Sequence, residues 1–251
     1  MRTRALLPIA ALLAACGDDA TSPLDASIDA VADAEVSFVQ AADTVLDAPG
    51  ASGQGFGDPT KAVNGVHGGG AENGSVDVYS LRFPPAANQW ITLGWSAGRL
   101  ANGPGNDLVV FENPFDTSQG PFMDLVIVEV SRDGVNFRPL AHDYVTTDET
   151  VYVRQLTAWV GFAGKTSVAF DSDTTVDPFD RAASGGDQFD LDDIVGDDAE
   201  AVAMRADGIT QVRLVTAPSR INPDTGALYV ADEYSNGADI DGVFGRYLMD
   251  R

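Results

Sequence analysis

The pattern of hydrophobic and polar positions predicts β-strands along most of this chain. From residue 35 onward, short apolar or alternating runs are separated by clusters of Gly, Asn, Asp and Pro, which is typical of strands joined by turns. No segment has the long apolar stripe of an amphipathic helix, and residues 198–204 are the best place for a helical turn. Strands are predicted at residues 36–39, 76–83, 90–95, 107–112, 125–131, 135–139, 159–162, 167–170, 211–216 and 242–248.

The clearest local prediction is a hairpin over residues 125–140, LVIVEVSRDGVNFRPL. Val126, Val128 and Val130 alternate with residues of the opposite face, and the Arg-Asp-Gly sequence at 132–134 supplies a turn in which glycine adopts a positive φ. With 26 glycines and 13 prolines distributed among such strands, the chain is predicted to be all-β, with a β-sandwich or jelly-roll architecture.

The first sixteen residues, MRTRALLPIAALLAAC, have the features of an export signal. Arg2 and Arg4 form a basic start, an apolar stretch follows, and it is too short to span a membrane as a mature helix. The sequence Leu-Ala-Ala-Cys that ends at Cys16 resembles the lipobox of bacterial lipoproteins, in which cleavage leaves a lipidated cysteine as the first residue. The alternative is an ordinary signal peptide with a cysteine there by chance.

The stretch after Cys16 is rich in Asp and Ala and poor in large apolar residues. Because Asp is a weak helix former, we expect a flexible acidic linker that lifts the domain off the membrane. The predicted organisation is a lipoprotein signal peptide at 1–15, the lipidated cysteine and Asp/Ala-rich linker at 16–35, and a single β-sandwich domain at 36–251.

Replacing Cys16 by Ser is expected to release the protein from membranes, because the acyl chains would have no attachment point and several chains are needed for stable anchoring. Membrane fractionation combined with acyl labelling of the parent and the variant measures this. The lipoprotein hypothesis is wrong if the parent carries no lipid and the variant stays with the membrane.

The charge of the chain restricts its partners. The net charge is −23, and cleavage before Cys16 would remove Arg2 and Arg4 but no acidic residue. Nucleic acid and anionic lipid headgroups are therefore not expected as partners, whereas divalent cations are. Cys16 is the only cysteine, so the domain has no internal disulfide and must be stabilised by its core and by any bound metal.

One acidic stretch predicts a cation site. Residues 185–200, GGDQFDLDDIVGDDAE, contain seven carboxylates, and no Lys or Arg lies between Arg181 and Arg205. Phe189 and Leu191 are threaded between the charges, which indicates a loop anchored in packed structure and not a disordered acidic run. Carboxylate and carbonyl oxygens at short spacing are the ligands of Ca²⁺, so we expect Ca²⁺ to be the cofactor.

The spacing does not fit an EF-hand, so we expect an irregular site shared between loops. For each group of candidate ligands, the alternative is a solvated loop or a turn. The candidates are Asp187, Asp190, Asp192 and Asp193 in the acidic stretch, Asn106, Asp107, Glu112 and Asn113 in a second group, and Asp239 and Asp241 in a third.

Several short segments match enzyme motifs only in part. The sequence Gly-Trp-Ser-Ala-Gly around Ser96 fits G-x-S-x-G, but the residues after it cannot form the required helix, and His142 is the only later histidine. Residues 161–166, GFAGKT, lack the spacing of a phosphate-binding loop. With only His67 and His142 in the chain, zinc and copper are not expected. A glycosidase would need two carboxylates, and nothing selects a pair. We expect a noncatalytic protein.

Several longer segments carry a resemblance to a known family. They are GQGFGDPTKAVNG (53–65), ANGPGNDLVVFENPF (101–115), MDLVIVEVSRDGVNF (123–137), GGDQFDLDDI (185–194) and NGADIDGVFGRYL (236–248). Together they resemble a family of uncharacterised bacterial cell-surface lipoproteins, and EVSRDGVNF resembles the hairpin of discoidin-like, galactose-binding-like jelly rolls. The resemblance covers most of residues 36–251. It implies a single secreted jelly-roll domain and no known activity.

The sequence thus predicts an exported binding protein, lipid-anchored to a bacterial membrane, with the outer membrane or cell surface as the expected location. Carbohydrate is one expected ligand, because Trp90, Trp95 and Trp159 could stack on a sugar face, although each also fits a core position. A surface protein is the other expected partner, which would make the domain a structural or adhesive module. A secreted hydrolase is the less favoured alternative.

Overall fold

The computed structural model describes residues 37–49, 55–82, 89–235 and 237–250. The chain divides into two units, residues 1–33 and 34–251. The first unit is outside the described residues, and so are the predicted signal peptide, Cys16 and the acidic linker up to residue 35. In the described ranges no helix has both the length and the apolar content needed to cross a bilayer.

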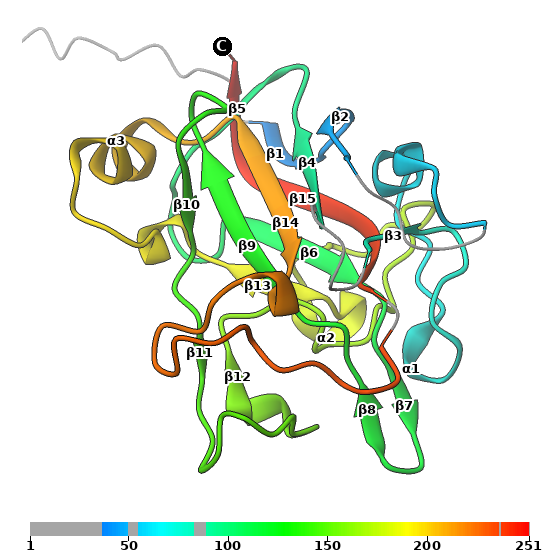
Figure 1. The fold of residues 1–251 in the computed structure, drawn as a ribbon. Coiled ribbons are helices and arrows are strands. Elements are labelled where there is room, and N and C mark those ends of the chain that lie inside the picture. The colour runs from blue at the N-terminus through cyan, green and yellow to red at the C-terminus, as the bar shows by residue number, and fades with distance from the viewer. Residues whose placement is uncertain (1–36, 50–54, 83–88, 236, 251) are drawn as a thin grey trace, which may run out of the picture. The chain divides into compact units, whose positions relative to one another are not determined.

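The second unit is built mainly from antiparallel sheets (Figure 1). The six-stranded sheet has the order β1 (Ser37–Ala41), β15 (Asp239–Asp250), β6 (Leu108–Glu112) and β13 (Asp187–Phe189), and β15 also pairs with β3 (Tyr79–Ser80) and β5 (Gly98–Leu100). The five-stranded sheet has the order β10 (Phe137–Pro139), β9 (Val126–Ser131), β14 (Gln211–Thr216), β4 (Trp90–Gly94) and β2 (Thr44–Asp47).

Short elements connect these sheets. Two small hairpins pair β7 (Phe115–Thr117) with β8 (Gly120–Phe122), and β11 (Asp143–Tyr144) with β12 (Trp159–Val160). The helices are α1 (Gly70–Asn73), α2 (Arg181–Ser184) and α3 (Ala199–Asp207), with 3₁₀ turns η1 (Pro59–Val63), η2 (Leu156–Ala158), η3 (Leu191–Asp193) and η4 (Ala217–Ser219).

The two large sheets share one hydrophobic core, as in a β-sandwich. Strand β6 has only buried residues, because Leu108 and Val110 face the shared core while Val109 and Phe111 face a second apolar cluster. The shared core takes side chains from both sheets, among them Leu108, Val110, Ile240 and Val243 from the first and Ile91, Leu93, Val128, Val130, Val212 and Leu214 from the second. Burial of this face supplies the main stabilisation of the fold.

Most predicted strands are confirmed, and the bounds predicted for β14 are the observed ones. The predicted helical turn is confirmed as α3, where the carboxylate of Asp198 accepts hydrogen bonds from the backbone N–H groups of Glu200 and Ala201. The strand predicted at 167–170 is wrong. Val168 makes one isolated bridge with Gly185, because the neighbouring backbone groups bond to loops on both sides.

The tryptophans correct one expectation about sugar binding. Trp95 is 1% exposed and Trp159 is 0% exposed, so neither ring offers a face to a ligand. Trp159 is stacked on Tyr144 in a separate apolar cluster under residues 141–163. Trp90 is half-buried and donates its ring N–H to Asp47 at 2.8 Å. The structure therefore uses these residues for packing.

Candidate metal centre

The acidic stretch at 185–200 does not fold into one loop. Asp187 lies on β13 opposite Val110, and its carboxylate is buried and accepts hydrogen bonds from the N–H of Lys165 at 2.8 Å and the hydroxyl of Thr166 at 2.9 Å. Asp190 instead caps η3 by accepting a hydrogen bond from the N–H of Asp192 at 2.8 Å. Asp187 therefore has a different environment from Asp190, Asp192 and Asp193, of which the first two lie near enough for their charges to raise the pKa of Asp193.

The rest of the stretch is exposed. The side chains of Asp192 and Asp193 face solvent, and Asp192 accepts a hydrogen bond from the side-chain amide of Asn102 at 2.7 Å. Asp193 contributes its backbone carbonyl, which accepts a hydrogen bond from the N–H of Ala141 at 2.8 Å. Neither carboxylate points into packed structure, so both have the environment of a solvated loop.

Several other predicted ligands stabilise turns. Asp107 is fully buried and accepts hydrogen bonds from the N–H groups of Gly103 at 2.8 Å and Leu191 at 2.9 Å, and burial raises its pKa to about 6. Asn113 exchanges hydrogen bonds with the backbone of Ser75. Through these bonds the two side chains join loops that are distant in sequence.

Two more of the predicted ligands also have protein partners. Asn106 donates to the side chain of Gln188 at 2.9 Å. Asp241 is fully buried, and its carboxylate accepts a hydrogen bond from the N–H of His67 at 3.1 Å. Burial raises the pKa of Asp241 to about 7. Both side chains are therefore occupied in joining neighbouring segments.

Two predicted ligands lie near a third acidic side chain that the sequence analysis did not name. This buried acidic cluster consists of Glu112 at the end of β6, Asp239 at the start of β15 and Asp124 just before β9. The pairing of Glu112 with Ile240 brings β6 and β15 together, and the N–H of Asp239 donates to Oε1 of Glu112 at 3.0 Å. The cluster brings two residues of the six-stranded sheet close to Asp124, which precedes β9 of the five-stranded sheet.

The second carboxylate oxygen of Glu112 has no hydrogen-bond partner among the residues that the structure describes. Glu112 is 3% exposed, and Oε2 is buried without a hydrogen bond. Gly164 lies against it: a Cβ placed on this glycine would be 3.1 Å from Oε2 of Glu112 and 2.5 Å from the backbone carbonyl oxygen of Asp124. An unpaired buried acceptor costs about 1–3 kcal/mol, and protonation of Glu112, whose pKa burial raises well above its usual value, or a bound cation would offset that cost.

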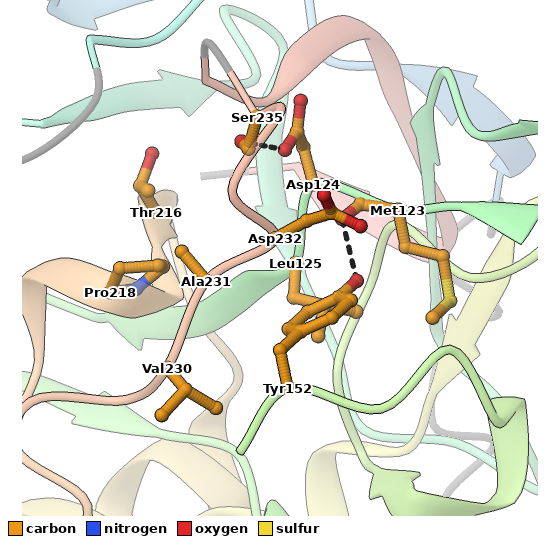
Figure 2. Close-up of a pocket in the computed structure, with 10 residues that line it drawn as sticks. All are labelled: Met123, Asp124, Leu125, Tyr152, Thr216, Pro218, Val230, Ala231, Asp232 and Ser235. Carbon is orange, nitrogen blue, oxygen red and sulfur yellow. Dashed lines mark hydrogen bonds between the residues drawn. The ribbon is translucent and has the colours of Figure 1, made fainter. Parts of the chain in front are cut away.

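Two serines contribute further oxygen atoms to the cluster. The hydroxyl of Ser235 donates to the carboxylate of Asp124, as Figure 2 shows, and the hydroxyl of Ser80 donates to that of Asp239. Hydroxyl oxygens can also accept or coordinate, because each keeps free lone pairs. The cluster therefore offers oxygen ligands of three kinds: carboxylate, hydroxyl and backbone carbonyl.

The electrostatics of the cluster favour the protonated forms of its acids unless a cation lies beside them. Burial, and then the charge of Asp124, raise the pKa of Glu112 well above its usual value. Burial also raises the pKa of Asp124 to about 7 and raises the pKa of Asp239. Asp187 lies near enough for its charge to raise the pKa of Glu112 further. A divalent cation would favour the charged forms of all these groups.

The donor set fits a hard cation. Every ligand atom of the cluster is oxygen, which suits Ca²⁺ or Mg²⁺ and not zinc or copper. In the described part of the chain, a single set of three His, Asp or Glu side chains has ligand atoms within 4.8 Å of one another, and it is the more exposed group of His67, Asp171 and Asp173. The carboxylates of the buried acidic cluster are more widely spaced, so an ion bound there would draw them together or use hydroxyl and carbonyl oxygens.

The sequence analysis named Glu112 and Asp239 as candidate ligands but did not name Asp124, which lies near them in the structure. In the sequence, Asp124 directly precedes a strongly apolar strand and looks like a turn residue. It also missed the approach of His67 to Asp171, whose Nδ1 and Oδ1 atoms are 3.7 Å apart. Asp124 and Asp239, like His67 and Asp171, lie about a hundred residues apart in the sequence, and no local pattern marks their approach.

The enzyme-like motifs have structural roles. Ser96 lies between β4 and β5, so a strand follows it in place of the helix of a nucleophile elbow, and its hydroxyl donates to Asp43 at 2.5 Å. In the loop at 161–166, the N–H groups of Lys165 and Thr166 donate to Asp187 and not to a phosphate. Neither motif has the surroundings that its chemistry requires.

Comparison with family models, curated proteins and solved structures gave no match to this chain.

Proposed function

We propose that this protein is an exported, lipid-anchored, noncatalytic binding protein whose β-sandwich domain is stabilised by Ca²⁺. The buried, unpartnered Oε2 of Glu112 is the observation that carries the proposal. A carboxylate in this position, next to Asp124 and Asp239, would be destabilising unless a cation or protons compensate it. Ca²⁺ supplies that compensation and accepts six to eight oxygen ligands in irregular geometry.

The placement of the cluster gives the ion a structural role. Glu112 and Asp239 belong to the six-stranded sheet, whereas Asp124 precedes β9 of the five-stranded sheet. An ion shared by these residues would link the two sheets at one end of the shared core. In a domain without a disulfide, such a link acts as a cross-connection between its two layers.

The partner classes follow from the anchor and the charge. Lipidated Cys16 would hold the protein to a bacterial membrane, with the outer membrane or cell surface as its location, and the net charge of −23 disfavours nucleic acid. The resemblance to cell-surface lipoproteins supports the same location. A glycan or a surface protein is the proposed ligand class, and a purely structural or adhesive role is the alternative. A hydrolase is less supported, because Ser96 lacks the elbow that would activate it.

Calcium binding tests the proposal directly. Isothermal titration of the chelator-treated protein is expected to show Ca²⁺ binding with a Kd in the range of about 10⁻⁶–10⁻³ M. Glu112→Gln and Asp124→Asn are expected to weaken it at least about tenfold, because each removes a charged ligand.

The double variant Asp190→Asn, Asp192→Asn is the matched control, since it removes two acidic charges outside the buried acidic cluster. It is expected to bind Ca²⁺ like the parent. Absence of binding up to about 10 mM Ca²⁺ would contradict the proposal. If only the control variant loses Ca²⁺ binding, the Ca²⁺ site lies in the acidic stretch at 185–200 and not in the buried acidic cluster.

A further inference from the structure

A polar groove lies beside the buried acidic cluster. It has a volume of about 520 Å³ and lies where the turn between β7 and β8 meets residues 151–154 and 231–234. Its main lining side chains are Gln119, Tyr152, Arg154, Asp232, Glu233 and Tyr234. The volume is within the usual range of ligand sites, and the lining is dominated by groups that donate and accept hydrogen bonds.

The wall of the groove is a preformed ion pair. Nη2 of Arg154 lies 2.6 Å from Oδ2 of Asp232, and Nε donates to the same oxygen at 2.8 Å. The carboxylate of Asp232 is only 4% exposed, and its other oxygen accepts the N–H of Tyr234 at 3.0 Å. Because both side chains are held by these bonds, little ordering is left for a ligand to impose.

The rim of the groove carries an exposed aromatic ring. Tyr234 is 67% exposed, so its ring is open to a ligand, unlike the buried tryptophans. Its hydroxyl is hydrogen-bonded to Glu233, which raises the pKa of Tyr234. An exposed ring next to fixed planar polar groups matches a sugar, whose C–H face packs on the ring while its hydroxyls bond to amide, guanidinium and carboxylate groups.

We propose that this groove binds a neutral carbohydrate, with Tyr234 as the stacking platform, Arg154 and Gln119 as hydrogen-bonding groups, and the buried Asp232 holding Arg154 in place. The charge of the groove selects against other ligands. Asp232 and Glu233 outweigh Arg154, so acidic sugars and phosphates are repelled. The mostly polar lining disfavours an apolar ligand, because the polar groups of the groove would lose their bound water without gaining hydrogen-bond partners.

This inference rests on the proposed function, since it names the ligand class of the proposed binding protein. The two sites share one segment. Asp232 and Tyr152 also line the small cavity of Figure 2 together with Asp124, and the adjacent Ser235 bonds to the carboxylate of Asp124. A cation at the buried acidic cluster would therefore hold the segment that carries Asp232 and Tyr234.

Calorimetric titration of the full chain with neutral hexasaccharides tests the proposal. The probes are cello-, manno-, xylo-, malto- and chitohexaose, each in Ca²⁺, with a hexagalacturonate as the anionic comparison. At least one neutral sugar is expected to bind and the anionic one is not. Tyr234→Ala is expected to weaken binding about tenfold, whereas Tyr234→Phe, which keeps the ring, retains most of it.

The proposal is overturned if none of the five neutral sugars binds at about 10 mM, or if Tyr234→Ala binds as well as the parent. Tighter binding of the hexagalacturonate would also overturn it. These failures are distinct from failure of the calcium proposal. Ca²⁺ binding without sugar binding refutes only the groove, and sugar binding by a protein that takes up no Ca²⁺ refutes only the metal centre.

Discussion

Removal of Ca²⁺ is expected to lower the melting temperature of this protein by about 5–10 °C. A ligand that binds only the folded state adds about 2.7 kcal/mol when its concentration is 100 times its Kd. For a chain of this size, each kcal/mol shifts the melting temperature by about 2–4 °C. Scanning calorimetry in chelator and in excess Ca²⁺ measures the effect. Mg²⁺ is expected to restore less, because it prefers a smaller octahedral site.

The variant Glu112→Gln is expected to reverse the order of stability. The side-chain amide of the glutamine keeps an oxygen that accepts the N–H of Asp239. The substitution also removes a buried carboxyl group beside Asp124. In chelator the variant should therefore melt at or above the temperature of the parent, and in Ca²⁺ it should melt below it. The double variant Asp190→Asn, Asp192→Asn should follow the parent in both conditions. Equal melting of the parent with and without Ca²⁺ would refute a stabilising ion.

Trp159→Ala is expected to lower the free energy of unfolding by about 3–5 kcal/mol. Trp159 is fully buried, stacks on Tyr144 and makes an edge contact with Phe162, with ring centroids 5.3 Å apart. Its ring N–H also donates to the carbonyl of Val153 at 2.9 Å. The change leaves a cavity and an unpaired carbonyl. Urea unfolding followed by circular dichroism measures the loss.

Trp90→Ala is the comparison for this prediction. Trp90 is half-buried and packs against the guanidinium of Arg213, with 5.1 Å from the carbon of that group to the ring centroid. The decrease in the free energy of unfolding caused by Trp90→Ala is expected to be clearly smaller, because less apolar surface returns to water. If Trp159→Ala unfolds at the same urea concentration as the parent and instead loses sugar binding, Trp159 is a ligand platform and the packing account is wrong.

The sequence by itself determined the strand content of the domain. Residues 211–216 and 126–131 became strands because short runs rich in β-branched apolar residues favour an extended, buried backbone, and that pattern is local. The helical turn at α3 was equally local, since the cap of Asp198 bonds within its own first turn. The turn glycine of the hairpin, Gly134, has the positive φ of 76° that its sequence predicts.

The tertiary structure decided the role of each carboxylate and each tryptophan. The carboxylates at 187–193 look equivalent in sequence. In the structure, Asp187 is a buried residue of strand β13, whereas Asp192 is an exposed residue of the 3₁₀ turn η3. Glu112 and Asp239 meet because β6 pairs with β15 across more than a hundred residues. A side chain's polarity is fixed by its own chemistry, whereas its burial and partners depend on which strands lie beside it, and that is set by the packing of the whole domain.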